Sequence, residues 1–276
     1  MRTQPRICIV TPSYNQAKFL EATILSVLGQ GYPNLEYIVM DGGSTDGSVD
    51  ILKRYTRHFA HWESKPDKGQ ADAILRGLKS ATGEILCYLN SDDLLLPGCL
   101  FKVSEHFRKY PSGSGVVGGT ILIGPDGKPK RDRLGLPQCD LGTRVSFKKL
   151  LLWKCGGFSQ PAAFWSKRAF EAAGGFDTSL HFSLDYDIFL RLARLAPFGR
   201  IRDFLACFRI HEDSKTTRLQ EVRAKEDQRI WADFGRFKYP AWYRGLFWHS
   251  CELNQQFQRR LMQAALILGL VRTPNL

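Results

Sequence analysis

The feature that most constrains the fold is an alternation of short apolar runs with amphipathic segments through the first third of the chain. The apolar runs, which have the length of buried strands, are residues 6–11, 35–40, 61–64 and 84–89. The segments between them carry apolar residues at helical spacing and are residues 19–28, 48–55 and 70–80. Strand–helix repetition with short links predicts an α/β fold with a mainly parallel sheet and helices on both faces.

The second half also contains predicted strands and a helix, but they alternate less regularly. Its predicted strands are residues 116–123, 162–166 and 204–211, and residues 184–195 are a predicted helix. From Leu219 onward the pattern is helical and rich in aromatic residues. We therefore expect one domain over residues 1–218 and a helical C-terminal appendage over residues 219–276.

The net charge and the cysteine pattern indicate the ligands that the chain attracts and the compartment in which it lies. The 276 residues carry a formal net charge of +12, which attracts phosphates, nucleic acid or anionic lipid. There is no secretory signal at the N-terminus, and no window approaches the roughly 20 apolar residues that span a bilayer. Seven cysteines occur without a C-x-x-C pair, which is typical of reduced thiols. These features predict a cytoplasmic chain.

Four polar loops follow the ends of predicted strands. They are residues 12–15, 41–46, 66–72 and 90–93. In open α/β sheets ligands bind beyond the carboxyl ends of the strands, so these loops are the expected site. Asp41, at a strand tip before two glycines, suits a nucleobase N–H. The alternative is a plain glycine turn in which Asp46 caps the next helix.

The loop Asn90-Ser91-Asp92-Asp93 carries paired carboxylates at another strand end. Oxygen ligands of this kind suit Mg²⁺ or Mn²⁺ that is shared with phosphates. The alternative is a capped turn before the next helix. His211 lies at the end of a predicted strand, where a site residue would lie, although a lone histidine is more often structural.

Two further motifs, one rich in glycine and one with two acids, have simpler explanations than a binding or catalytic site. Residues 113–118 match G-x-G-x-x-G but lead into a strand rather than a helix, so they do not predict a dinucleotide site. Asp185 and Asp187 lie about 200° apart around a helix, which argues against a two-carboxylate glycosidase. One of them is a candidate single base, and the alternative is an acid that balances the helix dipole.

Taken in order, eight short motifs resemble glycosyltransferase family 2, an inverting family with the GT-A fold. They span about residues 6–215 and are Thr11-Pro-Ser-Tyr-Asn15, Val39-Met-Asp-Gly-Gly-Ser-Thr-Asp-Gly47, Ser64-Lys-Pro-Asp-Lys-Gly-Gln70, Ala81-Thr-Gly-Glu84, Leu89-Asn-Ser-Asp-Asp93, Gly174-Gly-Phe-Asp177, Leu184-Asp-Tyr-Asp187 and Arg209-Ile-His211.

The resemblance implies a role for each matching residue. It assigns the nucleotide of a nucleoside diphosphate sugar to Pro12, Tyr14, Asp41, Asp72 and Asp92. It assigns the divalent metal, Mg²⁺ or Mn²⁺, to Asp92, Asp93 and His211. It makes Asp185 the catalytic base, and it places Gly175, Phe176 and Asp177 on the acceptor and donor-sugar side.

The sequence departs from the family motifs at two positions, and it lacks the motif of the processive members. Asn90 replaces the first Asp of the usual D-x-D-D run, and Gly42 replaces the second Asp of the common D-D-G-S turn. The Q-x-x-R-W sequence of processive members is absent, because no Arg precedes any of the six tryptophans. Transfer of a single sugar is therefore favoured over polymer synthesis.

The expected function is inverting transfer of one sugar to a hydroxyl of a glycan or lipid-linked acceptor, in surface polysaccharide assembly. The expected partners exclude nucleic acid and include an anionic membrane surface, because residues 240–271 place aromatic and aliphatic residues beside arginines. That surface would be the inner face of a membrane. Two alternatives stay open: a catalytically silent scaffold of the same fold, and a nucleotidyltransferase.

Overall fold

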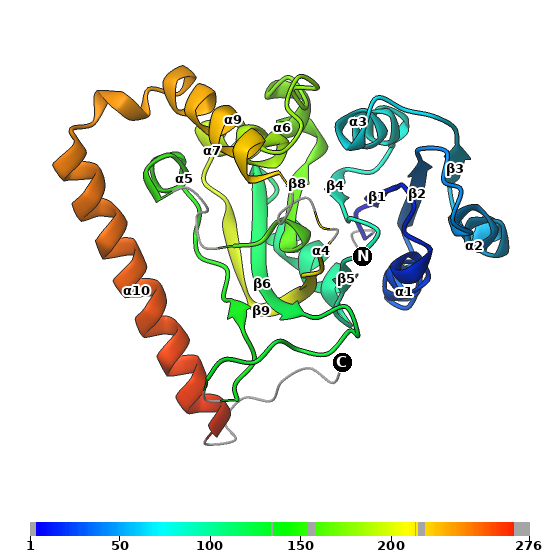
Figure 1. Ribbon diagram of the computed structural model, residues 1–276, viewed down its shortest axis with the longest axis horizontal. Helices are drawn as coiled ribbons and strands as arrows, with labels where there is room; N and C mark the ends of the chain where they lie inside the picture. The colour runs from blue at the N-terminus through cyan, green and yellow to red at the C-terminus, as the bar shows by residue number, and fades with distance from the viewer. Residues whose placement is uncertain (1–3, 134, 154–157, 213, 215–218, 268–276) are drawn as a thin grey trace.

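The computed structural model describes residues 4–133, 135–153, 158–212, 214 and 219–267 (Figure 1). Its first half alternates strands with helices, as the sequence predicts. The elements are β1 (Ile7–Ser13), α1 (Ala17–Leu28), β2 (Leu35–Asp41), α2 (Ser48–Tyr55), the 3₁₀ turn η1 (Thr56–His58), β3 (His61–Ser64), α3 (Gln70–Ser80), β4 (Ile85–Tyr88), β5 (Leu94–Leu95) and α4 (Cys99–Lys109).

The second half supplies the remaining strands and a helical C-terminus. Its elements are β6 (Gly115–Ile123), β7 (Cys139–Asp140), α5 (Phe147–Trp153), η2 (Gln160–Ala162), β8 (Ala163–Ser166), α6 (Lys167–Ala172), α7 (Leu184–Leu195), β9 (Gly199–Arg209), α9 (Gln220–Asp233), η3 (Arg236–Lys238) and α10 (Ala241–Ile267). Residues 113–118 run into β6, which fits a strand and not a dinucleotide loop.

The described strands form one sheet in the order β3-β2-β1-β4-β8-β6-β9-β5, with β7 paired to β6. The pairings of β1 with β2 and β4, of β2 with β3, and of β6 with β9 are parallel. The pairings that involve β8, β5 and β7 are antiparallel. The expected α/β architecture is therefore confirmed, with its parallel part in the N-terminal half and a mixed continuation.

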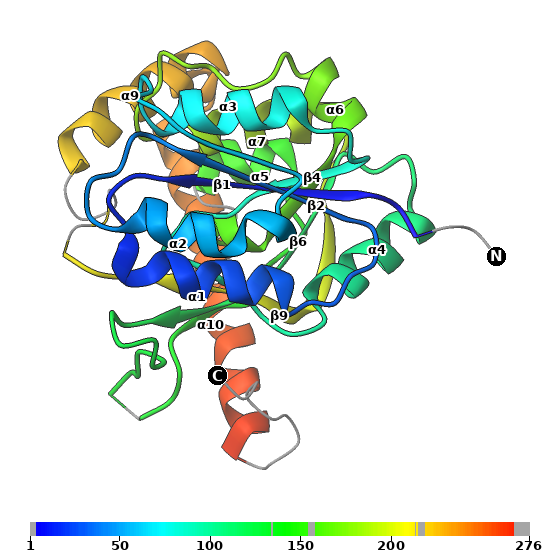
Figure 2. The same ribbon diagram turned by 90° about the vertical axis from the view of Figure 1, so that its right-hand side faces the viewer.

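Helices cover both faces of the sheet because alternate strand residues point to opposite sides. In β1, Ile7 and Ile9 pack into the core under α1, α2 and α4, whereas Cys8 and Val10 pack into the core under α3 and α7. Figure 2 shows α3 on one side of the strands and α1 and α2 on the other. This two-layer cover leaves the strand ends open for a site.

The C-terminal helices differ in how they attach to the sheet domain. Helix α9 lies against α7, while α10 runs along α5 and projects beyond the body of the molecule (Figures 1 and 2). No helix in the described part of the chain is both long and apolar enough to cross a membrane. The boundary at residue 218 stays a prediction, and residues 268–271 of the predicted membrane segment lie outside the described residues.

Candidate functional site

The loops that follow β1 and β2 are locked together by hydrogen bonds. The backbone N–H of Asn15 donates to Ser44 Oγ at 2.8 Å, and Thr45 N–H donates to Asn15 Oδ1 at 2.9 Å. Asn15 has a φ of +50°, a conformation that asparagine tolerates better than most residues. Tyr14, the residue predicted to contact the nucleotide, lies on this surface and is 63% exposed.

Asp41 is fully buried at the end of β2. Its carboxylate accepts hydrogen bonds from the backbone N–H groups of Gly43 and Ser44, and from the hydroxyls of Ser44 and Ser64. These bonds occupy most of what a carboxylate can accept. The carboxylate of Asp41 therefore orders the loop that follows β2, and its predicted contact with the nucleobase stays a prediction.

The structure explains why a glycine occupies position 42. A Cβ there would lie 2.9 Å from Asp67 Oδ2 and 3.2 Å from Tyr14 Cδ2. Asp67 therefore fills the space beside this turn, and it is a residue that the sequence did not single out. Asp72, on the first turn of α3, accepts from Lys68 N–H at 3.3 Å and pairs with Arg76 Nε at 3.4 Å. Pro12 lies buried in β1 opposite Met40, one residue before Asp41.

The structure brings together three of the residues predicted after β4 and β9. His211 Nε2 lies 2.9 Å from Asp92 Oδ2. Arg209, which the sequence did not single out as a separate site residue, fastens the two segments: its N–H donates to Asp93 Oδ1 at 2.8 Å and its Nε to the Asp92 carbonyl at 2.7 Å. Strand β9 thus carries His211 to a loop more than 110 residues away in sequence.

Asp92 and Asp93 are not equivalent. Asp93 is 1% exposed, and burial, together with the neighbouring Asp92 carboxylate, raises the pKa of Asp93 well above its usual range. The side chain of Asp92 is 19% exposed and faces His211. Asp92 is therefore the better candidate ligand, and Asp93 supports the loop through Arg209.

Asn90, the departure from the family run, has a defined partner. Its Oδ1 accepts from Gln70 Nε2 at 2.6 Å, and its amide nitrogen lies 3.5 Å from Asp93 Oδ2. A carboxylate at position 90 would add a third negative charge to this loop. The asparagine instead links the start of α3 to the β4 loop without adding charge.

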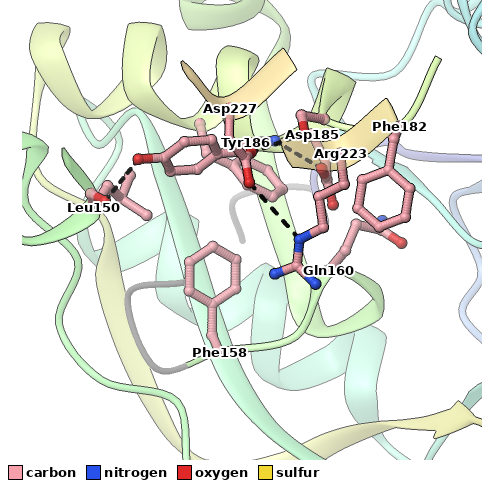
Figure 3. Close-up of a pocket in the computed structure, with 10 residues that line it drawn as sticks. Leu150, Phe158, Gln160, Phe182, Asp185, Tyr186, Arg223 and Asp227 are labelled. Carbon is pink, nitrogen blue, oxygen red and sulfur yellow. Dashed lines mark hydrogen bonds and ion pairs between the residues drawn. The ribbon is translucent and has the colours of Figure 1, made fainter. Parts of the chain in front are cut away.

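A pocket opens beside these loops, with Asp185 in its wall (Figure 3). Gln160 connects the two regions, because it lines the pocket while its Nε2 donates to the Tyr88 carbonyl, two residues before Asn90, at 2.7 Å. The other lining residues are mostly apolar and come from α5, α7 and their neighbours: Leu150, Phe158, Phe182, Ser183, Tyr186, Phe189, Arg223 and Asp227.

The environment of Asp185 suits a base. Burial raises the pKa of Asp185 to about 6, although a hydrogen bond from the Tyr186 N–H opposes the shift. Such a carboxyl is ionised at neutral pH yet more basic than an ordinary aspartate. Asp187 points elsewhere, since its Oδ2 accepts from Arg191 Nε at 3.0 Å and it does not line the pocket. The two acids therefore have different surroundings, as their helical spacing predicted.

The turn at residues 174–177 is fixed from two sides. Gly174 and Gly175 have φ values of +82° and +72°, which favour glycine. Phe176 is buried in the core, with its ring centroid 5.9 Å from that of Tyr88. Asp177 accepts from Ser179 N–H at 2.9 Å and from Arg229 Nη2 at 3.2 Å. Phe176 therefore anchors this turn in the core, and the acceptor-side role of the turn stays a prediction.

An α/β sheet flanked by helices, with these loops and this pocket at its strand ends, defines the protein as a glycosyltransferase of the GT-A fold. The family described as "Glycosyl transferase family 2" matches residues 8–172, and the chain belongs to that family. An uncharacterised glycosyltransferase of Mycobacterium tuberculosis is 31% identical over 210 residues, which cover 75% of this chain and 76% of the relative.

Other comparisons agree with this assignment. A putative teichuronic acid biosynthesis glycosyltransferase of Bacillus subtilis, TuaG, is 35% identical over 46% of this chain and 51% of its own. The structure of S. aureus TarS with UDP-GlcNAc superposes with a TM-score of 0.65 at 16% identity, covering 92% of this chain and 73% of TarS. The mannosyltransferase PcManGT from Pyrobaculum calidifontis, with GDP-Man and Mn²⁺, superposes with a TM-score of 0.58 at 18% identity, covering 98% of this chain and 82% of PcManGT. These two likenesses support the fold.

Proposed function

We propose that this glycosyltransferase transfers one sugar from a nucleoside diphosphate sugar, with inversion, and that Asp185 is the base. The observation that carries the proposal is the place of Asp185, an acid with a raised pKa, in the pocket wall beside the loops at the strand ends. Asp185 takes the proton of an acceptor hydroxyl, whose oxygen bonds to the anomeric carbon. The bond from that carbon to the diphosphate breaks, and the nucleoside diphosphate leaves with the electron pair. Loss of transfer in an Asp185→Asn variant that still binds nucleotide tests this role.

The residues around Asp92 fit a divalent metal. A carboxylate oxygen and an imidazole nitrogen lie 2.9 Å apart, close enough for one ion to bind both; the carboxylate suits Mg²⁺ or Mn²⁺, and the imidazole suits a transition-metal ion. Among the described residues no three His, Cys, Asp or Glu side chains form a complete ligand set, so diphosphate oxygens and water would complete the coordination. When bound, the ion would neutralise the negative charge that develops on the departing diphosphate.

The interlocked β1 and β2 loops are the proposed nucleotide platform, with Pro12, Tyr14, Asp41 and Asp72 around it. An Asp41→Ala variant is expected to bind nucleoside diphosphate about tenfold more weakly, because the loop loses the acceptor of four hydrogen bonds. Calorimetry with UDP and GDP measures the affinity, and thermal unfolding shows whether the sheet survives. Unchanged affinity in a folded variant would remove Asp41 from this role. The metal dependence of activity should change little.

The acceptor is proposed to be a glycan or a lipid-linked glycan at the cytosolic face of a membrane, in polysaccharide assembly. The similarity to TuaG supports the assembly role. The structure supports a membrane setting through α10, whose outer stripe we define as Trp242, Leu246, Leu253, Phe257 and Leu261. Each of these side chains is more than half exposed, and at about 100° per residue they fall on one side of the helix.

The opposite side of α10 is already occupied. Tyr243 and Phe247 pack on the core, Glu252 accepts from Trp153 Nε1 at 3.2 Å, and Arg259 pairs with Asp140 at 3.0 Å. Cations are exposed in the same region: Arg260 lies on α10, and the loop between β6 and β7 carries exposed Lys128, Lys130, Arg131 and Arg133. Figure 2 shows this loop projecting beside the lower half of α10. An apolar stripe beside clustered cations matches an anionic lipid surface.

Replacing Leu253 and Phe257 together by Glu is expected to weaken binding to anionic vesicles at least about tenfold, because burial of each side chain contributes about 1.5–3 kcal/mol. Co-sedimentation with phosphatidylglycerol vesicles at low salt measures it, and binding by the unaltered chain should fall as salt rises. Leu195→Glu is the matched control, since Leu195 is 53% exposed on α7. A chain that ignores these vesicles at low salt contradicts docking. A dimer that the double variant dissociates would assign the stripe to self-association.

A further inference from the structure

Helix α9 is held tightly against the pocket that contains Asp185. The Glu226 carboxylate accepts the backbone N–H groups of His181, Phe182 and Ser183 at 2.7, 2.9 and 2.8 Å, immediately before α7 begins. Asp227 accepts from the hydroxyl of Ser183 at 2.9 Å. These bonds fix α9 relative to Asp185, so a side chain one turn earlier on α9 has a defined place in the pocket.

Arg223 is that side chain. Its guanidinium carbon lies 5.5 Å from the centre of the Phe182 ring, and its Nε is 3.8 Å from Asp227 Oδ2, which is longer than a hydrogen bond. Figure 3 shows the guanidinium reaching into the pocket between Phe158 and Gln160. Among the hydrogen bonds that link the described residues, none involves the side chain of Arg223, although that side chain is only 28% exposed.

Two neighbouring arginines contrast with Arg223. Arg191 is bonded to Asp187, and Arg229 donates to Ser179 and Asp177. Arg223 therefore presents up to five N–H donors in a pocket that also holds four aromatic side chains and the acids Asp185 and Asp227. The planar fork of a guanidinium matches the oxygens of a carboxylate or phosphate, and the match is stronger where water is partly excluded.

We propose that Arg223 binds an anionic group of the acceptor, a carboxylate or a phosphate carried on the sugar whose hydroxyl is presented to Asp185. The inference rests on the proposed function, in which Asp185 is the base. It adds the substrate class: an acidic acceptor, with the apolar face of its ring against Phe158 and Phe182. A neutral acceptor leaves the half-buried guanidinium with only its 3.8 Å ion pair to Asp227, which selects against neutral sugars.

The test is binding of three probes that share one ring: glucuronic acid, glucose 6-phosphate and glucose. Ligand-observed NMR titrations are made with the full chain, Mg²⁺ and either UDP or GDP. At least one acidic probe is expected to bind about tenfold more tightly than glucose. Arg223→Gln should abolish that preference while leaving the affinity for glucose within about twofold of that of the unaltered chain. Which acidic probe binds more tightly separates the carboxylate from the phosphate. Arg223→Lys should retain part of the preference.

Lys225→Gln is the matched control, because it removes one positive charge from an exposed position on the same helix. This variant should bind every probe with the same affinity as the unaltered chain. Equal binding of acidic and neutral probes, no binding of either acid at millimolar concentration, or a preference that survives Arg223→Gln would each overturn the proposal. Asp185→Asn should retain the Arg223-dependent preference. If nucleotide binding fails while that preference persists, the proposed function is wrong and the acidic subsite stands.

Discussion

An Asp185→Asn variant is expected to transfer sugar about 10²–10⁴-fold more slowly while binding nucleoside diphosphate normally. The amide keeps the shape of the carboxyl group but cannot take a proton, and general-base catalysis typically contributes a factor of this size. Turnover with saturating substrates and calorimetry with the free nucleotide measure the two quantities separately. Near-normal turnover in this variant would show that the base lies elsewhere, with Asp187 the next candidate.

The pH profile gives an independent readout of the same role. Because the base must be ionised, kcat/KM should rise with pH through about 6, the raised pKa of Asp185, and then level off. The acid limb should be missing from whatever activity remains in Asp185→Asn. Asp187→Asn is the contrasting variant: it breaks the pair with Arg191, so it should lower the melting temperature and keep the acid limb.

The stability of Asp185→Asn should move in the opposite direction from its activity. The pKa of Asp185 is raised from 3.8 unfolded to about 6 folded, so the folded state binds more protons between these values and loses stability as pH rises through them. Removing the charge should therefore stabilise the protein above pH 6, by about 1–2 kcal/mol once solvent screening in the pocket is allowed for. Below about pH 4 the difference should vanish. Denaturant unfolding at the two pH values measures it.

Excess chelator is expected to reduce transfer at least about 100-fold, and added Mn²⁺ or Mg²⁺ should restore it. The physical reason is that a bound ion stabilises the charge on the departing diphosphate by several kcal/mol. Asp92→Ala and His211→Ala should each weaken nucleoside diphosphate binding in the presence of metal, and calorimetry with and without Mn²⁺ measures the coupling. Asp50→Ala is the control, because Asp50 is an 80% exposed acid on α2. Activity that is undiminished in excess chelator would contradict the metal assignment.

Much of the sheet was predictable from the sequence because its elements carry strong periodic patterns. Residues 48–55, 61–64, 70–80 and 184–195 are elements with the predicted bounds. Helix α5 was missed because its four consecutive apolar residues, Leu150, Leu151, Leu152 and Trp153, show no helical spacing of apolar and polar positions. The two-residue β5 exists only through its pairing with β9. Strand β9 begins five residues before the predicted start, where polar residues pair with β6.

The residues of the candidate site were predictable from the sequence, but their separate roles were not. Asp92 and Asp93 are adjacent in sequence, and only the contact of Asp93 with Arg209 on a distant strand distinguishes them. Arg223 gave no local signal, because α9 is a highly charged helix in which one more arginine is unremarkable. Its significance depends on Glu226 and Asp227, which hold the helix against the start of α7.

The most direct test of the central claim is an NMR assay of a panel of nucleoside diphosphate sugars, with Mn²⁺ replaced by Mg²⁺ for the spectra. One donor is expected to release its nucleoside diphosphate, and the anomeric configuration of the transferred or hydrolysed sugar should be inverted at first appearance. Asp185→Asn should abolish that signal. Retained configuration would contradict the single displacement. Pyrophosphate release from a nucleoside triphosphate and a sugar phosphate would indicate a nucleotidyltransferase, and a chain that binds no donor would be a scaffold of the same fold.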